Sequence, residues 1–313
     1  PDETKLILGA YLSINESYLY LADVKTGEKE LLTPKGGAEK VAYSDARFSR
    51  DGKAVYFTTD KGSEFHRLVR MELATKKETI LTPHINWDVD SIELSPDGSL
   101  LAFVTNEDGI GVLHLLDTRS GKEIPAPKLP LGTVSNLEWQ ENGRDLTSAK
   151  SPNDVYSADV KTGRVERWTE SETGGLNPEN FIEPELVKIK SFDGLALSGF
   201  LYRPDAKRFP GKRPVIINIH GGPEAQARPV FQARNNYYLS ELGVAILYPN
   251  VRGSAGYGKT FLTLDNGFKR KDSVKDGGAF LSWLGTHPRL DAGRVVVTGG
   301  SYGGYMSLAT AVD

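Results

Sequence analysis

The sequence predicts a partial β-propeller followed by an α/β domain that is built on a parallel sheet. Two observations carry this prediction. The first half of the 313 residues repeats short alternating strands and polar turns, and the second half contains three nearly continuous apolar runs that each open into a glycine-bearing loop. Alternation suits antiparallel strands with one face on a core, whereas continuous apolar runs suit parallel strands that are covered on both faces.

Polar turns recur about every 45 to 49 residues in the first half. They lie at Pro1–Glu3, Arg50–Gly52, Pro96–Gly98 and Glu141–Gly143. A second series falls between them, at Lys25–Gly27, Thr75–Lys77, Arg119–Gly121 and Lys161–Gly163. Two hairpin turns per period of this size describe a four-stranded blade. We therefore expect about four blades over residues 1–182, and we expect the chain to begin inside a blade.

A linker and a hairpin follow the repeats. Residues 169–185 lose strand alternation and gather glycine, proline and acidic residues, so the boundary is expected near Phe181–Glu185 and the second domain over residues 183–313. Leu186–Lys190 and Leu195–Tyr202 flank the Asp193–Gly194 dipeptide. This pattern predicts an antiparallel hairpin that enters the second sheet.

The apolar runs of the second half predict the parallel strands. They are Val215–Ile219, Val244–Tyr248 and Arg294–Thr298. Stretches that can be helical, roughly residues 231–242 and 274–284, are long enough for right-handed crossovers between these strands. Ligands bind outside the carboxyl ends of such strands, so we expect His220–Gly222 and Ser301 to converge at one edge of the sheet.

Ser301 is the predicted nucleophile. It is the serine of a G-x-S-x-G sequence, Gly299–Gly303, which lies between the last apolar run and a plausible helix over residues 305–309. In an α/β hydrolase this serine sits on a sharp strand-to-helix turn, and small flanking residues permit that turn. The helix N-terminus favours a developing oxyanion.

Two backbone N–H groups are the expected oxyanion donors. One belongs to Tyr302. The other belongs to Gly222, where Gly221 permits a close backbone approach. The alternative is that Gly221–Pro223 is just a turn, and a G-x-S-x-G match alone is weak evidence in a chain with 33 glycines.

Four motifs together resemble the prolyl oligopeptidase family of serine peptidases, with the closest match to its acylaminoacyl-peptidase-like and dipeptidyl-peptidase-like branches. They are Phe192–Gly194, His220–Pro223, Asn250–Gly258 and Gly299–Tyr305. The resemblance implies a β-propeller paired with a C-terminal α/β-hydrolase domain that cleaves short peptides. It implies a propeller of seven or eight blades, with roughly three or four of them upstream of this chain. Some branches supply the second oxyanion donor from a tyrosine at the position of His220, and many relatives carry proline where this chain has Val251.

No histidine of this chain fits the role of the catalytic base. His66, His84 and His114 belong to propeller sequence, and His287 lies just before the last apolar run. Because this fold orders its triad as Ser, then Asp or Glu, then His, we expect both partners of Ser301 beyond Asp313. The chain as given is therefore expected to hold the N-terminal half of a hydrolase domain and to lack peptidase activity.

Two further residues have open roles. His220 either orients the oxyanion turn or contacts substrate. Arg252 either binds a substrate carbonyl or carboxylate, or pins its own loop by hydrogen bonds.

Composition limits the alternatives. A net charge of −3 and a pI near 6.1 give no electrostatic reason to expect nucleic acid. No apolar stretch approaches the roughly 18 residues that span a bilayer. The absence of cysteine excludes disulfides, thiolate zinc sites and a cysteine nucleophile. We expect no metal or organic cofactor and short peptides as substrates, while an oligomer is possible and a cytoplasmic or a periplasmic or secreted location stays open. A carboxylesterase on the same fold and a non-catalytic propeller that binds a partner are the alternative functions.

Overall fold

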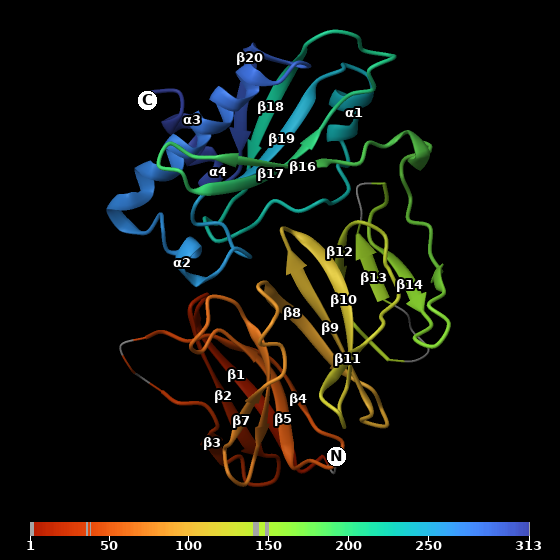
Figure 1. The fold of residues 1–313 in the computed structure, drawn as a ribbon, viewed down its shortest axis with the longest axis vertical. Helices are drawn as coiled ribbons and strands as arrows, with labels where there is room; N and C mark the ends of the chain where they lie inside the picture. The colour runs from red at the N-terminus through yellow and green to blue at the C-terminus, as the bar shows by residue number, and fades with distance from the viewer. Residues whose placement is uncertain (1–2, 36, 38, 140–143, 148–149, 313) are drawn as a thin grey trace.

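The computed structural model describes residues 3–35, 37, 39–139, 144–147 and 150–312. Over these residues the chain forms four antiparallel sheets, then one mixed sheet with helices packed on it (Figure 1). The predicted order of a partial β-propeller followed by an α/β domain is confirmed.

The four antiparallel sheets are the predicted blades. The first contains β1 (Lys5–Ser13), β2 (Glu16–Asp23) and β3 (Lys29–Leu31). The second contains β4 (Tyr43–Phe48), β5 (Ala54–Thr59), β6 (Arg67–Glu72) and β7 (Glu78–Ile80). The third contains β8 (Asp88–Leu94), β9 (Leu100–Glu107), β10 (Ile110–Asp117) and β11 (Lys122–Ile124). The fourth contains β12 (Thr133–Ser135), β13 (Arg144–Thr147), β14 (Asp154–Ala158) and β15 (Val165–Arg167). Each sheet is a meander in chain order. The predicted turns over Arg50–Gly52 and Pro96–Gly98 join the first two strands of their blades, whereas Pro1, Asp2 and Glu141–Gly143 lie outside the described residues.

The blades stack face to face because both faces of their middle strands are apolar. Successive side chains of a strand point to opposite faces. On β5, Val55 and Phe57 accordingly pack with residues of the first blade, whereas Tyr56 packs with residues of the third. On β9, Phe103 belongs to the core shared with the second blade, and Val104 to the core shared with the fourth.

The mixed sheet has the order β16-β17-β19-β18-β20. Its strands are β16 (Glu185–Lys190), β17 (Ala196–Tyr202), β18 (Arg213–Ile219), β19 (Ala245–Asn250) and β20 (Leu290–Gly299). The first two form the predicted antiparallel hairpin, and β18 pairs in parallel with both β19 and β20. The three glycine-bearing loops therefore leave the sheet at the same edge.

Helices cover both faces of this sheet. They are α1 (Asn235–Ser240), α2 (Lys259–Leu262), α3 (Arg270–Thr286) and α4 (Tyr302–Ala309), with short 3₁₀ turns η1 (Pro178–Asn180) and η2 (Gly267–Lys269). Side chains of α3 and α4 share a core with Ile217, while Leu239 of α1 shares a separate core with Ile216 on the other face. The helix expected over residues 231–242 is shorter, because Ala233 takes a left-handed φ of 43° and Gly243 ends the segment with a φ of 63°.

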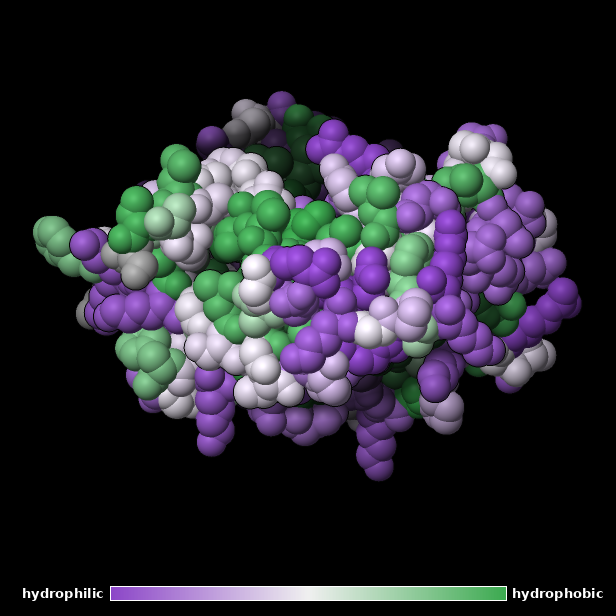
Figure 2. All heavy atoms as spheres, turned by 90° about the horizontal axis from the view of Figure 1, so that it is seen from above, coloured by the Kyte–Doolittle hydropathy of each residue, from purple (hydrophilic) through white to green (hydrophobic). Residues whose placement is uncertain are grey.

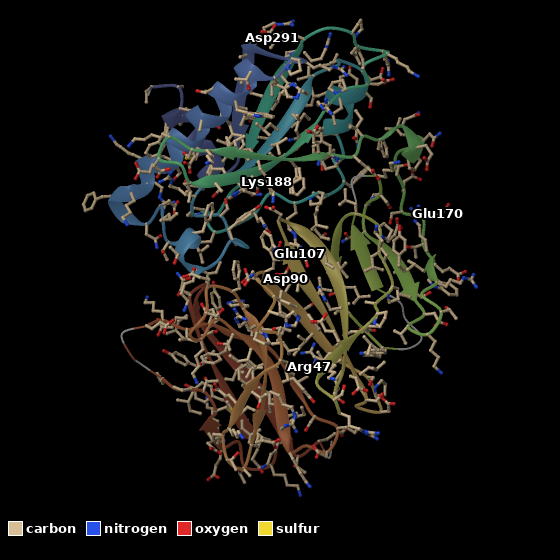
Figure 3. The ribbon with its side chains drawn as sticks, in the orientation of Figure 1. Arg47, Asp90, Glu107, Glu170, Lys188 and Asp291 are labelled. Carbon is tan, nitrogen blue, oxygen red and sulfur yellow. The ribbon has the colours of Figure 1, made fainter. Side chains whose placement is uncertain are left out.

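The carboxyl edge of the parallel strands faces the propeller. After β19, the N–H groups of Lys259 and Thr260 donate to the Glu64 main-chain carbonyl and carboxylate, at 2.8 Å each. After β18, Arg228 Nε donates to the Gly109 carbonyl at 2.9 Å. Figure 3 shows Lys188 on the α/β side of this boundary and Asp90 and Glu107 on the propeller side. A boundary at residues 182 and 183 stays a prediction.

The surface of the α/β domain that faces away from the propeller has both apolar and hydrophilic areas (Figure 2). Among the described residues of the α/β domain, Val296 on the edge strand β20 and Leu308 on α4 are exposed apolar side chains. No described helix is both long and apolar enough to cross a membrane.

Candidate active site

Ser301 occupies a strained turn between β20 and α4. The strand ends at Gly299 and the helix begins at Tyr302, so the chain reverses within two residues. Ser301 has φ 54° and ψ −119°, a backbone conformation that residues other than glycine rarely adopt. Such a conformation costs about 1–3 kcal/mol and persists only where the surroundings enforce it. The side chain of Ser301 is exposed.

Two glycines of the G-x-S-x-G sequence let this turn press against the end of β18. A Cβ atom on Gly303 would lie 2.0 Å from the Ile219 carbonyl oxygen, and one on Gly299 would lie 2.4 Å from the same oxygen. Neither position can carry a side chain without moving the backbone. The close approach of the helix to the neighbouring strand is what holds Ser301 in its strained conformation.

The loop after β18 reaches the same turn. A Cβ atom on Gly221 would lie 3.5 Å from the Cβ of Ser301 and 3.5 Å from the Gly300 carbonyl oxygen. Within the described residues, neither the N–H of Gly222 nor that of Tyr302 has a hydrogen-bond partner. The structure thus brings the loop of Gly221 and Gly222 to the turn of Ser301 and Tyr302. The oxyanion roles of Tyr302 and Gly222 stay predictions.

His220 has two hydrogen-bond contacts, and neither of them is with Ser301. Its Nδ1 lies 2.7 Å from the Gly221 carbonyl oxygen, and its Nε2 lies 2.8 Å from Ser254 Oγ. Burial lowers the pKa of His220 below its usual value, although the hydrogen bond to Gly221 acts in the opposite direction. The neutral imidazole is therefore the favoured form at neutral pH.

The other histidines have partners elsewhere. His84 and His114 both contact Glu123, and the ring of His114 stacks on Phe103 with centroids 4.7 Å apart. His287 ends α3 and packs against Trp283. Across the part of the chain that the structure describes, no side chain hydrogen-bonds the Ser301 hydroxyl, and no group of histidine, aspartate and glutamate residues is arranged to hold a metal ion.

Two family models match the sequence. The model for "Prolyl oligopeptidase, N-terminal beta-propeller domain" matches residues 1–171, and the model for "Prolyl oligopeptidase family" matches residues 229–313. The chain belongs to the prolyl oligopeptidase family. Its relatives include a prolyl endopeptidase of Elizabethkingia meningoseptica, which is 25% identical over 99% of this chain and 43% of that protein. An uncharacterized peptidase of Bacillus subtilis, YuxL, is 32% identical over 52% of this chain and 24% of that protein.

Solved structures of the family have the same fold. A puromycin hydrolase superposes with a TM-score of 0.86 at 22% identity, over 100% of this chain and 50% of that one. A prolyl endopeptidase superposes with a TM-score of 0.82, over 99% of this chain and 45% of that one. The chain thus spans half or less of the length of these relatives.

Arg252 is occupied by two carboxylates. Its main-chain N–H and its Nε donate to Asp276 Oδ2 at 2.8 and 2.9 Å, and its terminal nitrogens reach both oxygens of Asp193 at 3.0 and 3.1 Å. Burial lowers the pKa of Arg252, but these hydrogen bonds outweigh that effect and leave the pKa above its usual value. The contacts favour the loop-pinning alternative for Arg252, and a role in substrate binding stays a prediction without a contact to support it.

Asp265 is a site residue that sequence reasoning missed. Asp265 is fully buried. Its Oδ2 atom lies 2.9 Å from an Arg270 nitrogen and accepts a 3.4 Å hydrogen bond from the Tyr302 hydroxyl. The Arg270 guanidinium lies 5.0 Å from the centroid of the Tyr302 ring. These contacts fix the side chain of Tyr302, the residue that follows Ser301 and carries one of the two predicted oxyanion donors. Asp265 belongs to none of the four motifs, so no sequence signal pointed to it.

Proposed function

We infer that the whole protein is a serine-type peptidase that hydrolyses short peptides through an acyl-enzyme on Ser301. The observation that carries this proposal is the left-handed, exposed Ser301 at the carboxyl edge of a parallel sheet, with Gly221 of the loop after β18 packed against its turn. Relatives that bear the names of prolyl endopeptidases and a dipeptidyl-peptidase support the reaction class. An acylaminoacyl-, dipeptidyl- or oligopeptidase specificity is left open.

The mechanism follows from these positions. The Ser301 oxygen attacks the scissile carbonyl, and its proton passes to a histidine that acts as general base. The carbonyl oxygen becomes an oxyanion between the N–H groups of Tyr302 and Gly222, and Gly221 allows the second donor to approach. The amine leaves, and water then hydrolyses the acyl-enzyme. Because no described residue contacts the Ser301 hydroxyl, the histidine and its aspartate are proposed to follow Ser301 in the gene product, in the order usual for this fold.

The position of Ser301 supports a preference for short substrates. The loop after β18 borders Ser301 at Gly221, and Arg228, which follows later in the same connection, contacts the propeller. We therefore propose that substrate approaches Ser301 from the side of the propeller. An extended peptide fits such an approach more readily than a folded protein does.

The test uses the protein as its gene encodes it. We expect hydrolysis of a peptide p-nitroanilide to fall by about 10³-fold or more in Ser301→Ala, because the covalent step is lost. Ser282→Ala is the matched control, since this serine lies on α3 and bonds the Gly278 carbonyl. A fluorophosphonate probe should label the parent protein and the control but not Ser301→Ala.

The alternatives have distinct outcomes. A protein that turns over p-nitrophenyl esters through Ser301 but no peptide anilide is a carboxylesterase. Hydrolysis that survives Ser301→Ala, or a protein with no turnover and no labelling, contradicts the proposal. The second of these results is the one expected of a non-catalytic binding module.

A further inference from the structure

We propose that Asp265 and Arg270 are positioning residues that hold Ser301 in its left-handed conformation through the side chain of Tyr302. The proposal rests on the proposed function, because it concerns the serine that would attack the substrate. It assigns a task to a buried carboxylate and to an arginine that lie outside the four sequence motifs.

The turn around Ser301 has a single neighbouring side chain by which it can be held. Apart from Tyr302, the two residues on each side of it are glycines, Gly299–Gly300 before it and Gly303–Gly304 after Tyr302. Glycine has no Cβ and leaves the backbone free to rotate. The packing against β18 restricts this backbone, and Tyr302, which is bonded to Ser301 and only 8% exposed, can add a second restraint.

Arg270 restrains the Tyr302 ring. This arginine is the first residue of α3, and its guanidinium lies 5.0 Å from the ring centroid. A guanidinium is attracted to the face of an aromatic ring and stacks on it as a plane, which an ammonium group cannot do. The Arg270 side chain is 30% exposed, so burial alone does not fix its position. It needs a partner that does.

Asp265 is that partner. Its side chain is fully buried, and Oδ2 lies 2.9 Å from an Arg270 nitrogen. The Tyr302 hydroxyl donates to the same oxygen at 3.4 Å, a long contact that contributes little by itself. Among the described residues Oδ1 has no hydrogen-bond partner. Burial raises the pKa of Asp265 and Arg270 acts in the opposite direction, so the buried carboxylate depends on the arginine that it orients.

The loop after β19 fixes Asp265 in place. A Cβ atom on Gly253 would lie 2.3 Å from the carboxyl carbon of Asp265, so the carboxylate packs directly on the Gly253 backbone. The N–H groups of Gly253 and Leu264 both donate to the Phe261 carbonyl, at 3.1 and 3.2 Å. The carboxylate that orients Arg270 is therefore attached to hydrogen-bonded backbone.

Release of this restraint should change how often Ser301 is competent to react. The left-handed conformation is strained and persists only where the surroundings enforce it. Without the restraint, part of the population relaxes, and only the remaining fraction can attack a carbonyl. We expect kcat and the rate of covalent labelling of Ser301 to fall by the same factor, while the affinity for peptide is kept.

Arg270→Met is the principal test, because a partly exposed residue can be replaced without disturbing the core. We expect kcat for a peptide anilide to fall by about 10-fold and KM to change little. The rate of labelling by a fluorophosphonate should fall equally. Arg270→Lys keeps the charge but loses the stacked plane, so its kcat should lie between those of Arg270→Met and the parent protein.

Arg208 is the matched control. It pairs with Glu241 at 2.8 Å, and its guanidinium lies 5.2 Å from the centroid of the Phe209 ring. The same chemistry therefore occurs before the amino end of β18, whereas Ser301 lies at the carboxyl edge of the sheet. Arg208→Met should leave kcat and the labelling rate unchanged.

A double variant separates positioning from stability. Arg270→Met leaves the Asp265 carboxylate buried without a cation and should lower the melting temperature. Asp265→Asn added to Arg270→Met removes that charge, so the melting temperature should recover while kcat stays low. In the Ser301→Ala background, Arg270→Met should leave the dissociation constant of the uncleaved peptide unchanged. With a merely structural role, kcat would instead recover together with the melting temperature.

NMR of protein labelled with ¹³C-serine tests the restraint without turnover. The signal of Ser301 is assigned by its loss in Ser301→Ala, and its Cα and Cβ shifts report the backbone conformation. They should indicate the left-handed conformation in the parent protein and move in Arg270→Met. Identical shifts in the two proteins overturn the proposal, as does an unchanged kcat in Arg270→Met.

Failure of this inference and failure of the proposed function give different results. If Ser301→Ala abolishes hydrolysis while Arg270→Met retains full kcat, the inference fails and the proposed function stands. If the parent protein neither hydrolyses peptides nor reacts with the probe, but the Ser301 shifts move in Arg270→Met, the proposed function fails and the restraint stands.

Discussion

The turns of the propeller and the loops of the hydrolase domain are stabilised over very different distances in the sequence. In the propeller, exposed aspartates accept hydrogen bonds from N–H groups two or three residues later, as Asp23, Asp117 and Asp159 do. Around Ser301, the partners are far apart: Arg252 and Asp276 are separated by 24 residues, and His220 and Ser254 by 34. A propeller turn is thus self-contained, whereas each loop of the site depends on a distant element. A substitution in a propeller turn should therefore change only that turn, whereas a substitution in a loop around Ser301 should change the structure of the site.

The largest effect on stability is expected from Asp276→Ala. The side chain of Asp276 is 0% exposed and that of Arg252 is 5% exposed, so the substitution leaves a buried guanidinium without its main partner. Removal of one member of a buried ion pair typically costs about 3–5 kcal/mol. The free energy of unfolding by urea measures this loss.

Asp272→Ala is the matched control on the same helix. Asp272 pairs with Lys275 at the surface, where solvent and salt screen the pair and its contribution to stability is small. Equal losses in the two variants would contradict the contrast between buried long-range and exposed local contacts.

The next effect concerns the contact between α4 and β18. Gly303→Ala places a methyl group 2.0 Å from the Ile219 carbonyl oxygen, so the helix must move. Overpacking of this kind typically costs about 1–3 kcal/mol. We also expect hydrolysis to fall, because Ser301 moves with the helix.

Gly304→Ala isolates the steric cause. An added Cβ there meets nothing closer than the Gly299 carbonyl oxygen at 3.5 Å, and alanine favours a helix over glycine by about 1 kcal/mol. The melting temperature should therefore fall in Gly303→Ala and stay equal or rise in Gly304→Ala. An equal fall of the melting temperature in Gly303→Ala and Gly304→Ala would contradict the steric explanation.

These distances also explain what the sequence could and could not predict. The repeats gave the blades and the G-x-S-x-G sequence gave the turn, because both patterns are local and each residue type is required by its own backbone. Asp265 lies outside every motif, because the packing of the chain brings its partners to it. Ser254 lies inside the Asn250–Gly258 motif, but its contact with the distant His220 could not be predicted from the sequence. The sequence indicated Arg252 as a candidate residue but left open whether it binds substrate or pins its own loop. The structure favours the second role, because the distant Asp193 and Asp276 accept its hydrogen bonds. The helix over residues 231–242 was predicted too long because Ala233 has a left-handed φ, which an alanine in the sequence does not indicate.

A smaller, pH-dependent effect is expected at Asp193. The hydrogen bond from Arg252 lowers the pKa of Asp193 in the folded protein. A depressed carboxyl pKa contributes stability above the unfolded value of about 3.9, and this contribution is lost as the pH falls through the folded value. The melting temperature of Asp193→Asn should therefore lie below that of the parent protein at pH 7, and the two should approach each other below about pH 4. A gap that is constant with pH would show that the charge of Asp193 is not what matters.

The smallest effect is expected at Asp97, in the turn of the third blade. Hydrogen bonds from the Ser95 hydroxyl and from the N–H and hydroxyl of Ser99 lower the pKa of Asp97 to about 2. Asp97→Asn should lower the melting temperature slightly at pH 7. Because the folded pKa is depressed, the gap should persist as the pH falls to about 4 and close only towards pH 2.

The Asp97 variant also tests whether a propeller turn is self-contained. All of its side-chain partners lie within two residues of it, so the change should be confined to the β8–β9 hairpin. Amide hydrogen exchange should accelerate in that hairpin alone, and kcat for the peptide anilide should equal that of the parent protein. Faster exchange in the loop that carries Gly221 would mean that the blades transmit local changes to the site, and the contrast between the two halves of the molecule would then fail.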